Sequence, residues 1–547
     1  MKRDMVDNGA VEEIASNARP NPPSRLGTKR WFFVSAVLVA LALVIAWQRW
    51  HTYAQAVPND TGYYAVIAHE TLQGRELYAD LYDPEPPGTA ATYALAELAA
   101  GYGHSSLYLM EVAAGVLTLL GVFAAAYFAG GGIAGGLWAA LFWAVISGDA
   151  ALYGNQPTRE AFMNVCLVWA FAFLAKEDLR RRFSLGLVAV GILWAAASLY
   201  KLLAVVSAAA LAIAYVVSAS ATREVRKRAV THMIGLAVIG ALGWGMTSLY
   251  FVVTRRFDAF WESVFQVAGQ HGGKMLGELL HDPGGHNLMD FLLPDFLYFA
   301  VPLFCVSLVG VSYGRLTGFR RQAALVLASH VGILVVVALH GSSWAPYHWL
   351  LWLPVVCVGA GWGLGIFLRS TTGNLKLPLY VAGITVALFL LRYEGAFYLR
   401  PPDDWSRIQM GGYGNVMIEA RNLAREIDSL LKPDETFCQL ANEPELYYYS
   451  RRRPPTGFLT IYPVLQEHFA THASFVKRLI ADIAREKPEL IVITVWDVQS
   501  GGIAREPFVS VLKNYRLLPG KPQRGVFVLL CLKGGRLENT ALPLNFQ

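Results

Sequence analysis

Long apolar runs alternate with short polar segments along the first 391 residues of the chain. Runs long enough to cross a hydrocarbon core of about 30 Å recur throughout this part. They fall at 31–47, 106–129, 133–150, 160–175, 184–200, 202–219, 230–254, 293–313, 322–340, 349–368 and 377–391. The pattern predicts a polytopic α-helical membrane protein with about 11 transmembrane helices.

From Arg392 onward the pattern becomes that of a globular domain. Helices are predicted over 415–431 and 475–486, the latter with Ser474 as its N-cap, and strands over 436–440, 490–495 and 525–532. Alternation of helix and strand is typical of an α/β domain. We therefore predict a cytoplasmic tail over 1–30, a transmembrane domain over 31–391 and an extracytoplasmic α/β domain over 392–547.

The composition agrees with a membrane protein, since 55% of the residues are hydrophobic and only 16% are charged. The formal net charge of +6 raises the question of nucleic-acid binding. The basic residues, however, lie in short clusters between apolar runs, at Lys176–Arg182, Arg223–Arg228, Arg315–Arg321 and Arg369–Lys376. The positive-inside rule places such clusters in the cytoplasm. We predict a multi-pass plasma-membrane protein with a cytoplasmic N-terminus and no nucleic-acid partner.

The charge rule also decides the apolar segment 87–103. If this segment crossed the membrane, all four basic clusters would face outward. An amphipathic segment lying at the outer face removes that conflict. The chain over 51–105 is therefore predicted to be one long outer-face segment.

This outer-face segment is unusually rich in ionisable groups between Asn59 and Gly88. Asp60 begins a stretch with helical character that ends near Gly74, so the simplest role for Asp60 is an N-cap. A carboxylate at a lipid–water boundary can also accept a proton or help to hold a divalent cation. The sequence leaves these roles open.

Other polar residues fall at predicted outer ends of helices. Thr158 is a candidate cap for the next helix, and the helix dipole favours Glu160 in the first turn. Arg159 or Glu160 could instead face the first outer loop across the site. Lys201 lies between two apolar runs, where it either snorkels or binds a phosphate. His340, Tyr347 and His348 fit an interfacial aromatic belt, and the two histidines could also contact phosphate or sugar.

Two further features remain ambiguous. The polar loop 255–292 contains paired glycines and suggests a flap that orders on substrate binding. The five cysteines match no metal spacing. Cys438 and Cys531 could pair in an oxidising compartment or remain free buried thiols.

Several short motifs resemble those of the GT-C membrane glycosyltransferases. The nearest group is glycosyltransferase family 39, with the protein O-mannosyltransferases and the lipid A aminoarabinose transferases. The matching positions are Asp60, Tyr63, Tyr64, Gly74, Leu77, Tyr78, Asp80, Pro86, Pro87, Pro157, Glu160, Lys201 and Tyr347–Pro354, with a looser match at Glu443–Tyr447. The chain departs from the pattern at Thr61, Glu85 and Glu111. A second acidic residue is usual at the first position, and basic residues are common at the other two.

The resemblance implies inverting transfer of a sugar from a polyprenyl-phosphate donor to a glycan, lipid or protein acceptor at the outer membrane face. It implies that Asp60 is the general base. It assigns the donor phosphate to Lys201, Arg75, Arg159 and His348, and the acceptor to Tyr63, Tyr64, Tyr78, Asp80 and Tyr347. It also allows a divalent metal cation held by Asp60 and Glu160.

Two other classes of protein fit parts of the pattern. A multi-span transporter of a lipid-linked or envelope precursor would place ionisable residues in the middle of its helices. Here they gather at predicted helix ends, which disfavours transport. A membrane scaffold whose outer domain binds a partner is the third interpretation.

Overall fold

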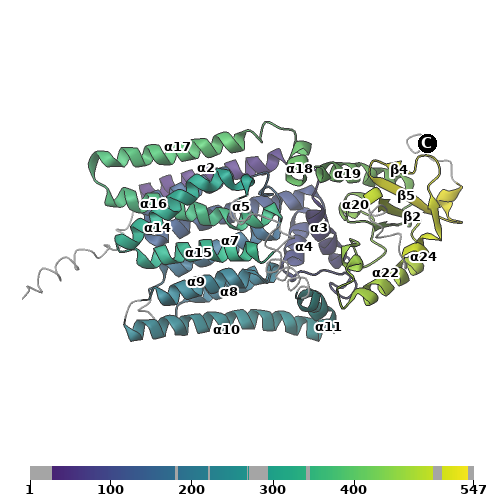
Figure 1. Cartoon of the computed structure of the whole chain (residues 1–547), viewed down its shortest axis with the longest axis horizontal. Helices are drawn as coiled ribbons and strands as arrows, with labels where there is room; N and C mark the ends of the chain where they lie inside the picture. The colour runs from purple at the N-terminus through teal and green to yellow at the C-terminus, as the bar shows by residue number, and fades with distance from the viewer. Residues whose placement is uncertain are drawn as a thin grey trace, which may run out of the picture.

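The computed structural model describes residues 27–178, 183–219, 222–267, 269, 294–340, 345–496 and 508–539. It consists of a bundle of long helices with a smaller α/β domain at one end (Figure 1). The polypeptide passes from the bundle into this domain after α17 (Lys376–Gly395), through α18 (Pro402–Met410) and α19 (Tyr413–Leu430). Parts of the predicted tail, of the loop 255–292 and of the basic cluster Lys176–Arg182 lie outside the described residues.

Helices occupy all eleven predicted positions in the bundle. They are α2 (Thr28–His51), α5 (His104–Ala126), α6 (Gly132–Ile146), α7 (Arg159–Lys176), α8 (Leu185–Tyr200), α9 (Ala204–Val217), α10 (Arg223–Val253), α14 (Val301–Leu316), α15 (Arg320–Ala338), α16 (Leu353–Ser370) and α17 (Lys376–Gly395). Within the described residues, seven helical stretches are long and apolar enough to cross a membrane, and one of these contains both α5 and α6. The polytopic helical architecture is thus confirmed, whereas eleven spans stay a prediction.

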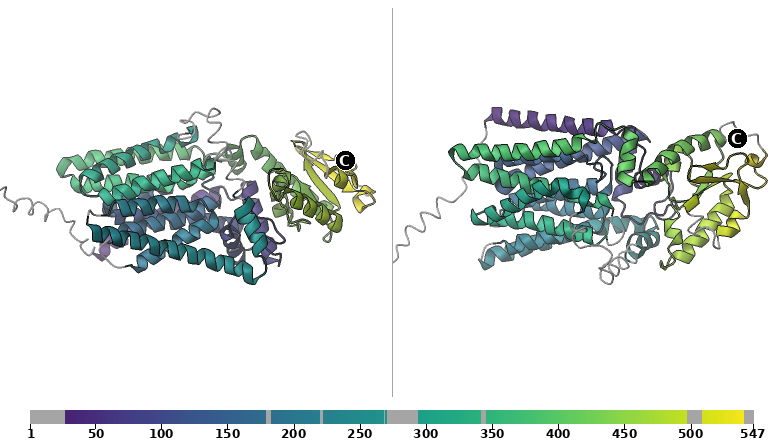
Figure 2. Two further views of the ribbon diagram at one scale, coloured as in Figure 1. Left: turned by 60° about the horizontal axis from the view of Figure 1, so that its bottom comes forward. Right: turned by 45° about the horizontal axis from the view of Figure 1, so that its top comes forward.

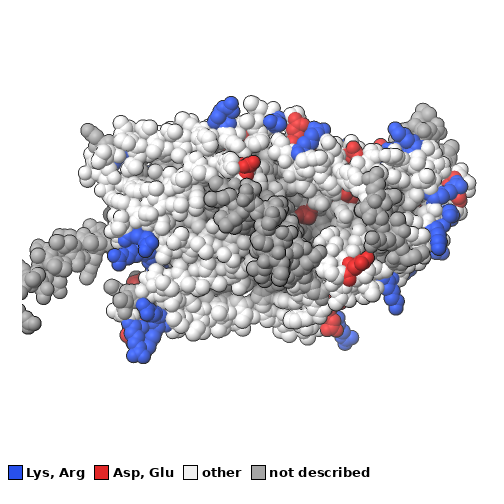
Figure 3. All heavy atoms as spheres, viewed as in Figure 1, with Lys and Arg blue, Asp and Glu red and all other residues white. Residues whose placement is uncertain are grey.

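The predicted basic clusters gather at the end of the bundle away from the α/β domain. Lys176 and Arg315 lie in the last turns of α7 and α14, and Arg223 and Arg320 begin α10 and α15. On the face shown in Figure 3, the described bundle surface between the two ends carries few charges. An apolar belt between charged ends is what a lipid bilayer requires. The cytoplasmic location of the basic end stays a prediction.

The predicted outer-face segment lies between the bundle and the α/β domain. Its helices α3 (Asn59–Leu72) and α4 (Gly88–Ala100) pack on each other, and α4 also packs on α5 and α8 (Figure 1). At 13 residues, α4 is too short to span a membrane, in agreement with the charge argument. The predicted cap is wrong: α3 begins at Asn59 after Pro58, and Asp60 lies in its first turn. Gly74, at φ +94°, follows the end of α3.

The α/β domain contains a mixed sheet in the order β1-β2-β5-β3, with β4 paired to β5. The strands are β1 (Phe437–Leu440), β2 (Leu490–Thr494), β3 (Tyr515–Leu517), β4 (Gln523–Arg524) and β5 (Phe527–Leu532), and only β1 and β2 run parallel. Helices α19 (Tyr413–Leu430) and α22 (His472–Glu486) match the two predicted ones. The N-cap of α22 is Thr471, not Ser474. The short strands β3 and β4 were not predicted.

The sheet also decides between the two states of Cys438 and Cys531. Both are free buried thiols. Cys438 pairs with Ile491 of β2, and Cys531 lies on β5 beyond β2. Strands two places apart in a sheet are separated by roughly 9–10 Å, which is too far for a disulfide. The alternative of a disulfide is therefore excluded, and that of two free buried thiols is confirmed.

The α/β domain is held firmly against α3 and the loop that follows it. A Cβ atom on Gly62 would lie 3.0 Å from the backbone of Glu445, so α3 and α20 (Glu445–Ser450) meet without room for a side chain there. Arg75 donates hydrogen bonds to the carbonyls of Pro454 at 3.0 Å and Thr456 at 3.1 Å. These contacts hold the α/β domain against the outer-face segment, and the domain lies beyond one end of the bundle (Figure 2).

Candidate active site

The carboxylate of Glu160 forms the centre of a buried polar cluster at the end of the bundle that faces the α/β domain. Thr158 caps α7 by accepting a hydrogen bond from the amide of Ala161, which confirms the predicted cap and places Glu160 in the first turn. The Glu160 side chain is only 1% exposed. Its Oε1 atom lies 3.4 Å from Nζ of Lys201 and 3.0 Å from Nδ1 of His348. Three segments distant in sequence therefore meet at one carboxylate.

Lys201 reaches this carboxylate because it follows the last residue of α8, where the chain turns into α9. Its side chain is 12% exposed, so the ammonium is directed inward and does not snorkel to water. His348 is carried by a short 3-10 helix over Pro346–Leu351 and stacks on His340, with ring centroids 3.7 Å apart. The ionic contact with Glu160 offsets part of the cost of burying the lysine.

Asp60 and Arg159 complete the cluster. The hydroxyl of Tyr347 donates a 3.0 Å hydrogen bond to Oδ2 of Asp60. The Arg159 guanidinium forms an ion pair with Glu85 and lies 5.6 Å from the centroid of the Tyr64 ring. The structure thus brings together the predicted residues Asp60, Tyr64, Arg159, Glu160, Lys201, Tyr347 and His348.

The other predicted residues have structural partners in the loop after α3. Tyr63 donates to the carbonyl of Tyr82 at 2.5 Å, and Tyr78 donates to that of Glu85 at 2.8 Å. Asp80 accepts from the amide of Glu76 at 2.9 Å. Arg75 pairs with Glu70 and holds the α/β domain, as described above. This geometry places these four side chains in the framework of the outer-face loop and not in the cluster around Glu160.

Two side chains beside the cluster, Glu85 and Asp83, have no site role in the motif pattern, whereas His340, a candidate contact for phosphate or sugar, stacks on His348. Asp83 is completely buried, and its Oδ1 atom accepts a 3.0 Å hydrogen bond from the amide of Glu85. Burial raises the pKa of the Asp83 carboxyl to about 8, and the nearby Arg159 guanidinium opposes that rise. The Asp83 side chain is therefore neutral in the folded protein at pH 7.

Replacing Asp83 by asparagine is expected to flatten the pH dependence of stability. Aspartate in the unfolded chain ionises near pH 4 (about 3.9), whereas the folded protein keeps Asp83 protonated up to about pH 8. The folded state holds the extra proton in this window, so the free energy of unfolding of the wild type falls as the pH rises through it. Thermal unfolding of both proteins in detergent across this window measures the effect. Parallel curves would contradict the assignment.

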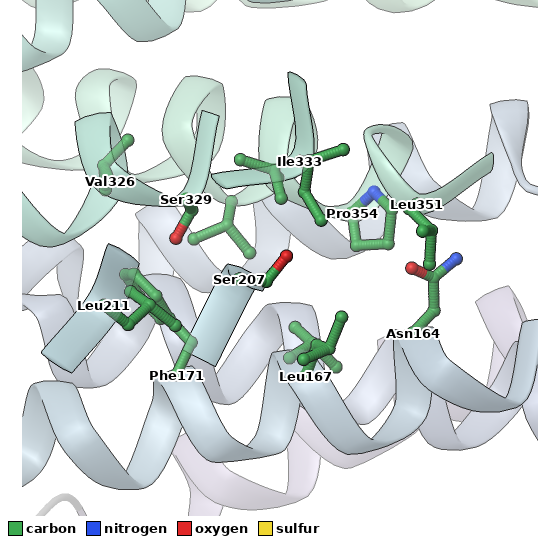
Figure 4. Close-up of a pocket in the computed structure, with 13 residues that line it drawn as sticks. Asn164, Leu167, Phe171, Ser207, Leu211, Val326, Ser329, Ile333, Leu351 and Pro354 are labelled. Carbon is green, nitrogen blue, oxygen red and sulfur yellow. The ribbon is translucent and has the colours of Figure 1, made fainter. Parts of the chain in front are cut away.

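An apolar cavity begins one helical turn from Glu160 along α7, in the direction away from the α/β domain. Its lining includes Asn164 on α7, at the i+4 position from Glu160, and Leu351, three residues beyond His348. From there it extends between α7, α9, α15 and α16 to Phe171, Leu211 and Val326 (Figure 4), and its empty space, part of which is open to the surroundings, is about 520 Å³. Asn164 to Phe171 on α7 corresponds to a depth of about 10 Å at 1.5 Å per residue. A charged cluster and an apolar cavity therefore adjoin within the bundle.

The implied divalent cation at Asp60 and Glu160 finds no full set of ligands. The described residues contain no group of three or more His, Cys, Asp or Glu side chains placed to hold a metal ion. Glu160 already contacts Lys201 and His348. Positive neighbours oppose the entry of a cation. The divalent cation at Asp60 and Glu160 stays a prediction.

The comparisons with known proteins agree on the fold. No protein-family model and no curated protein matches the chain at the level of sequence. The structure is similar to that of ArnT from Cupriavidus metallidurans in the apo state, with a TM-score of 0.56 and 15% identity over 92% of this chain and 98% of that one. It is also similar to the archaeal oligosaccharyltransferase AglB from Archaeoglobus fulgidus in complex with an inhibitory peptide and a dolichol-phosphate, with a TM-score of 0.51 and 13% identity over 95% of this chain and 76% of that one.

These similarities confirm the resemblance that the motifs suggested. The chain has the fold of the GT-C membrane glycosyltransferases. It is a multi-pass membrane protein with a small mixed α/β domain appended to the bundle. At such low identity the similarity establishes the fold, and the chemistry is argued from the site itself.

Proposed function

We propose that this protein is an integral-membrane glycosyltransferase that moves a sugar from a polyprenyl-phosphate donor to a hydroxyl of an envelope glycan, lipid or protein. One observation carries the proposal: a buried cluster with two cations and a hydrogen-bonded carboxylate lies directly above an apolar cavity. A lipid-linked phosphate has the matching pattern, with an anionic head joined to an apolar chain. The predicted outer-face location of the site fits an acceptor that arrives from outside the cell.

The cavity below Glu160 fits the first part of the isoprenoid chain. Its lining is mostly aliphatic, with Leu167, Leu211, Val326 and Ile333 among its walls. A hydrocarbon chain that lies in this cavity packs against its apolar walls. This packing fixes the depth at which the attached phosphate lies. The phosphate of a bound donor would then lie at the level of Glu160, within reach of Lys201 and Arg159.

The chemical step follows from these positions. Asp60 accepts the proton of the acceptor hydroxyl as its oxygen forms a bond to the anomeric carbon. The bond between that carbon and the phosphate oxygen breaks, and the polyprenyl phosphate leaves with the bonding electrons. Attack opposite the leaving phosphate inverts the anomeric configuration. Lys201 and Arg159 stabilise the negative charge that develops on the leaving group.

The Tyr347 hydroxyl prepares Asp60 for this role. Its hydrogen bond occupies Oδ2, so the carboxylate is oriented with its other oxygen available to an acceptor hydroxyl. The Tyr347 ring packs against Tyr153, with ring centroids 5.4 Å apart. This packing limits rotation of the phenol, and a fixed partner keeps the base in a reactive orientation.

Glycan profiling tests the proposed function in the cell. A strain that lacks the gene is complemented with the wild-type protein or with the Asp60→Asn variant, and the envelope glycans are analysed by mass spectrometry. We expect one sugar modification to disappear in the deletion strain, to return with the wild type and to remain absent with the variant. Identical glycan profiles in all strains would contradict a transferase.

A further inference from the structure

Both cations of the cluster are already paired with carboxylates. Lys201 contacts Glu160, and Arg159 contacts Glu85. A phosphate that binds to either cation must therefore replace a carboxylate or share the cation with it. Carboxylate and phosphate oxygens use the same donor geometry on a guanidinium, so one can take the place of the other.

The two carboxylates differ in how easily each can be displaced from its cation. The Glu160 side chain is 1% exposed and contacts both Lys201 and His348. The Glu85 side chain is 23% exposed and lies on a loop between Pro84 and Pro86. The backbone around Glu85 is fixed, because its amide donates to Asp83 and its carbonyl accepts from Tyr78. Only the side chain of Glu85 has to rotate for Arg159 to be released.

The charges of the cluster also favour release of one carboxylate. Asp60, Glu85 and Glu160 contribute three negative charges, whereas Arg159 and Lys201 contribute two positive ones. The cluster is therefore negative by one charge before an anion enters. If a phosphate entered while all three carboxylates stayed in place, still more negative charge would gather in a buried site, which is unfavourable. Rotation of Glu85 toward solvent removes one negative charge from the site.

We propose that Glu85 is an internal stand-in for the donor phosphate, held on Arg159 in the empty site and displaced when the lipid-linked donor binds. This inference rests on the proposed function. The consequence is specificity for lipid-linked phosphates. A small anion that binds Arg159 only takes the place of the Glu85 carboxylate, so one ion pair is exchanged for another. A polyprenyl phosphate gains in addition the packing of its chain against the cavity walls beneath Glu160.

Equilibrium binding of two probes to the purified full-length protein in detergent tests this role. The probes are a polyprenyl monophosphate and inorganic phosphate. In the Glu85→Gln variant the neutral amide makes a weaker bond to Arg159, so less interaction is lost when phosphate binds. We expect the Kd for polyprenyl monophosphate to fall by about tenfold, and inorganic phosphate to bind measurably better than to the wild type. Glu85→Ala is expected to change both values in the same direction.

Glu97→Gln is the matched control. Glu97 also lies in the outer-face segment, has a side chain that is 13% exposed and pairs with a basic partner, His69, at 2.7 Å. It lies outside the cluster, so its replacement is expected to leave both Kd values unchanged. The inference is overturned if Glu85→Gln and Glu85→Ala bind polyprenyl monophosphate with the wild-type Kd or more weakly. If the wild type itself does not bind polyprenyl monophosphate, the proposed function fails, and the inference fails with it.

Discussion

Replacing Asp60 by asparagine is expected to reduce the turnover number by a factor of about 10²–10⁴, the range that a positioned general base contributes. Asparagine keeps the size of the side chain and can still accept the hydrogen bond from Tyr347. The amide cannot take the proton of the acceptor hydroxyl. The Kd for the donor should change little, because Asp60 does not hold the phosphate. Steady-state transfer by the purified variant, together with donor binding, measures both values.

Asp404→Asn is the control for this experiment. Asp404 lies on α18 (Pro402–Met410), is partly exposed and pairs with Arg407 at 2.6 Å. The same chemical change at this distant site is expected to leave turnover at the wild-type level. Retention of more than a tenth of the wild-type turnover (about 10% or more) by Asp60→Asn would contradict its role as the base.

Replacing Lys201 by methionine is expected to lower the rate of transfer by a factor of about 10²–10³, since a preorganised charge next to the leaving group is lost. The change should also weaken binding of polyprenyl monophosphate. Stability should fall as well, because Glu160 remains buried without its ammonium partner. Turnover, Kd and the temperature of unfolding in detergent measure the three effects.

A double variant separates the catalytic role of Lys201 from its structural role. Lys201→Met combined with Glu160→Gln removes both members of the buried pair, so we expect it to recover most of the lost stability. Transfer should remain low, because no ammonium is available to the leaving phosphate. Recovery of both stability and transfer in the double variant would show that Lys201 has only a structural role.

The sequence predicts the positions of charged groups best where burying a charge is costly whatever the fold. Lys201 lies between two apolar runs, where its charge must either snorkel to water or face a polar site, and in the structure the ammonium faces the Glu160 cluster. The basic clusters predicted one common end of the bundle, and the described helices agree. The segment 87–103 was also placed correctly outside the set of membrane-crossing helices, from the charge rule alone.

Contacts between distant segments were beyond the reach of the sequence. Arg75 looked like a ligand for the donor phosphate, but its partners Pro454 and Thr456 are more than 370 positions away. The pair between Glu85 and Arg159 has no signal in local spacing, because it forms only after α3 and α4 pack against α7 and α8. Cys438 and Cys531 could not be assigned without the order of the strands, which places β2 between them. In each case the three-dimensional arrangement decides which partner a side chain finds.

Donor consumption by the purified protein tests the central claim most directly. A polyprenyl-phosphate sugar with a labelled anomeric carbon is supplied together with an acceptor extract from the cell envelope, and the products are followed by mass spectrometry and NMR. The account predicts that each transferred sugar releases one polyprenyl monophosphate and that the anomeric configuration is inverted. It also predicts that Asp60→Asn transfers sugar far more slowly than the wild type. An intact donor after prolonged incubation with the wild type, or transfer with retained configuration, would contradict it.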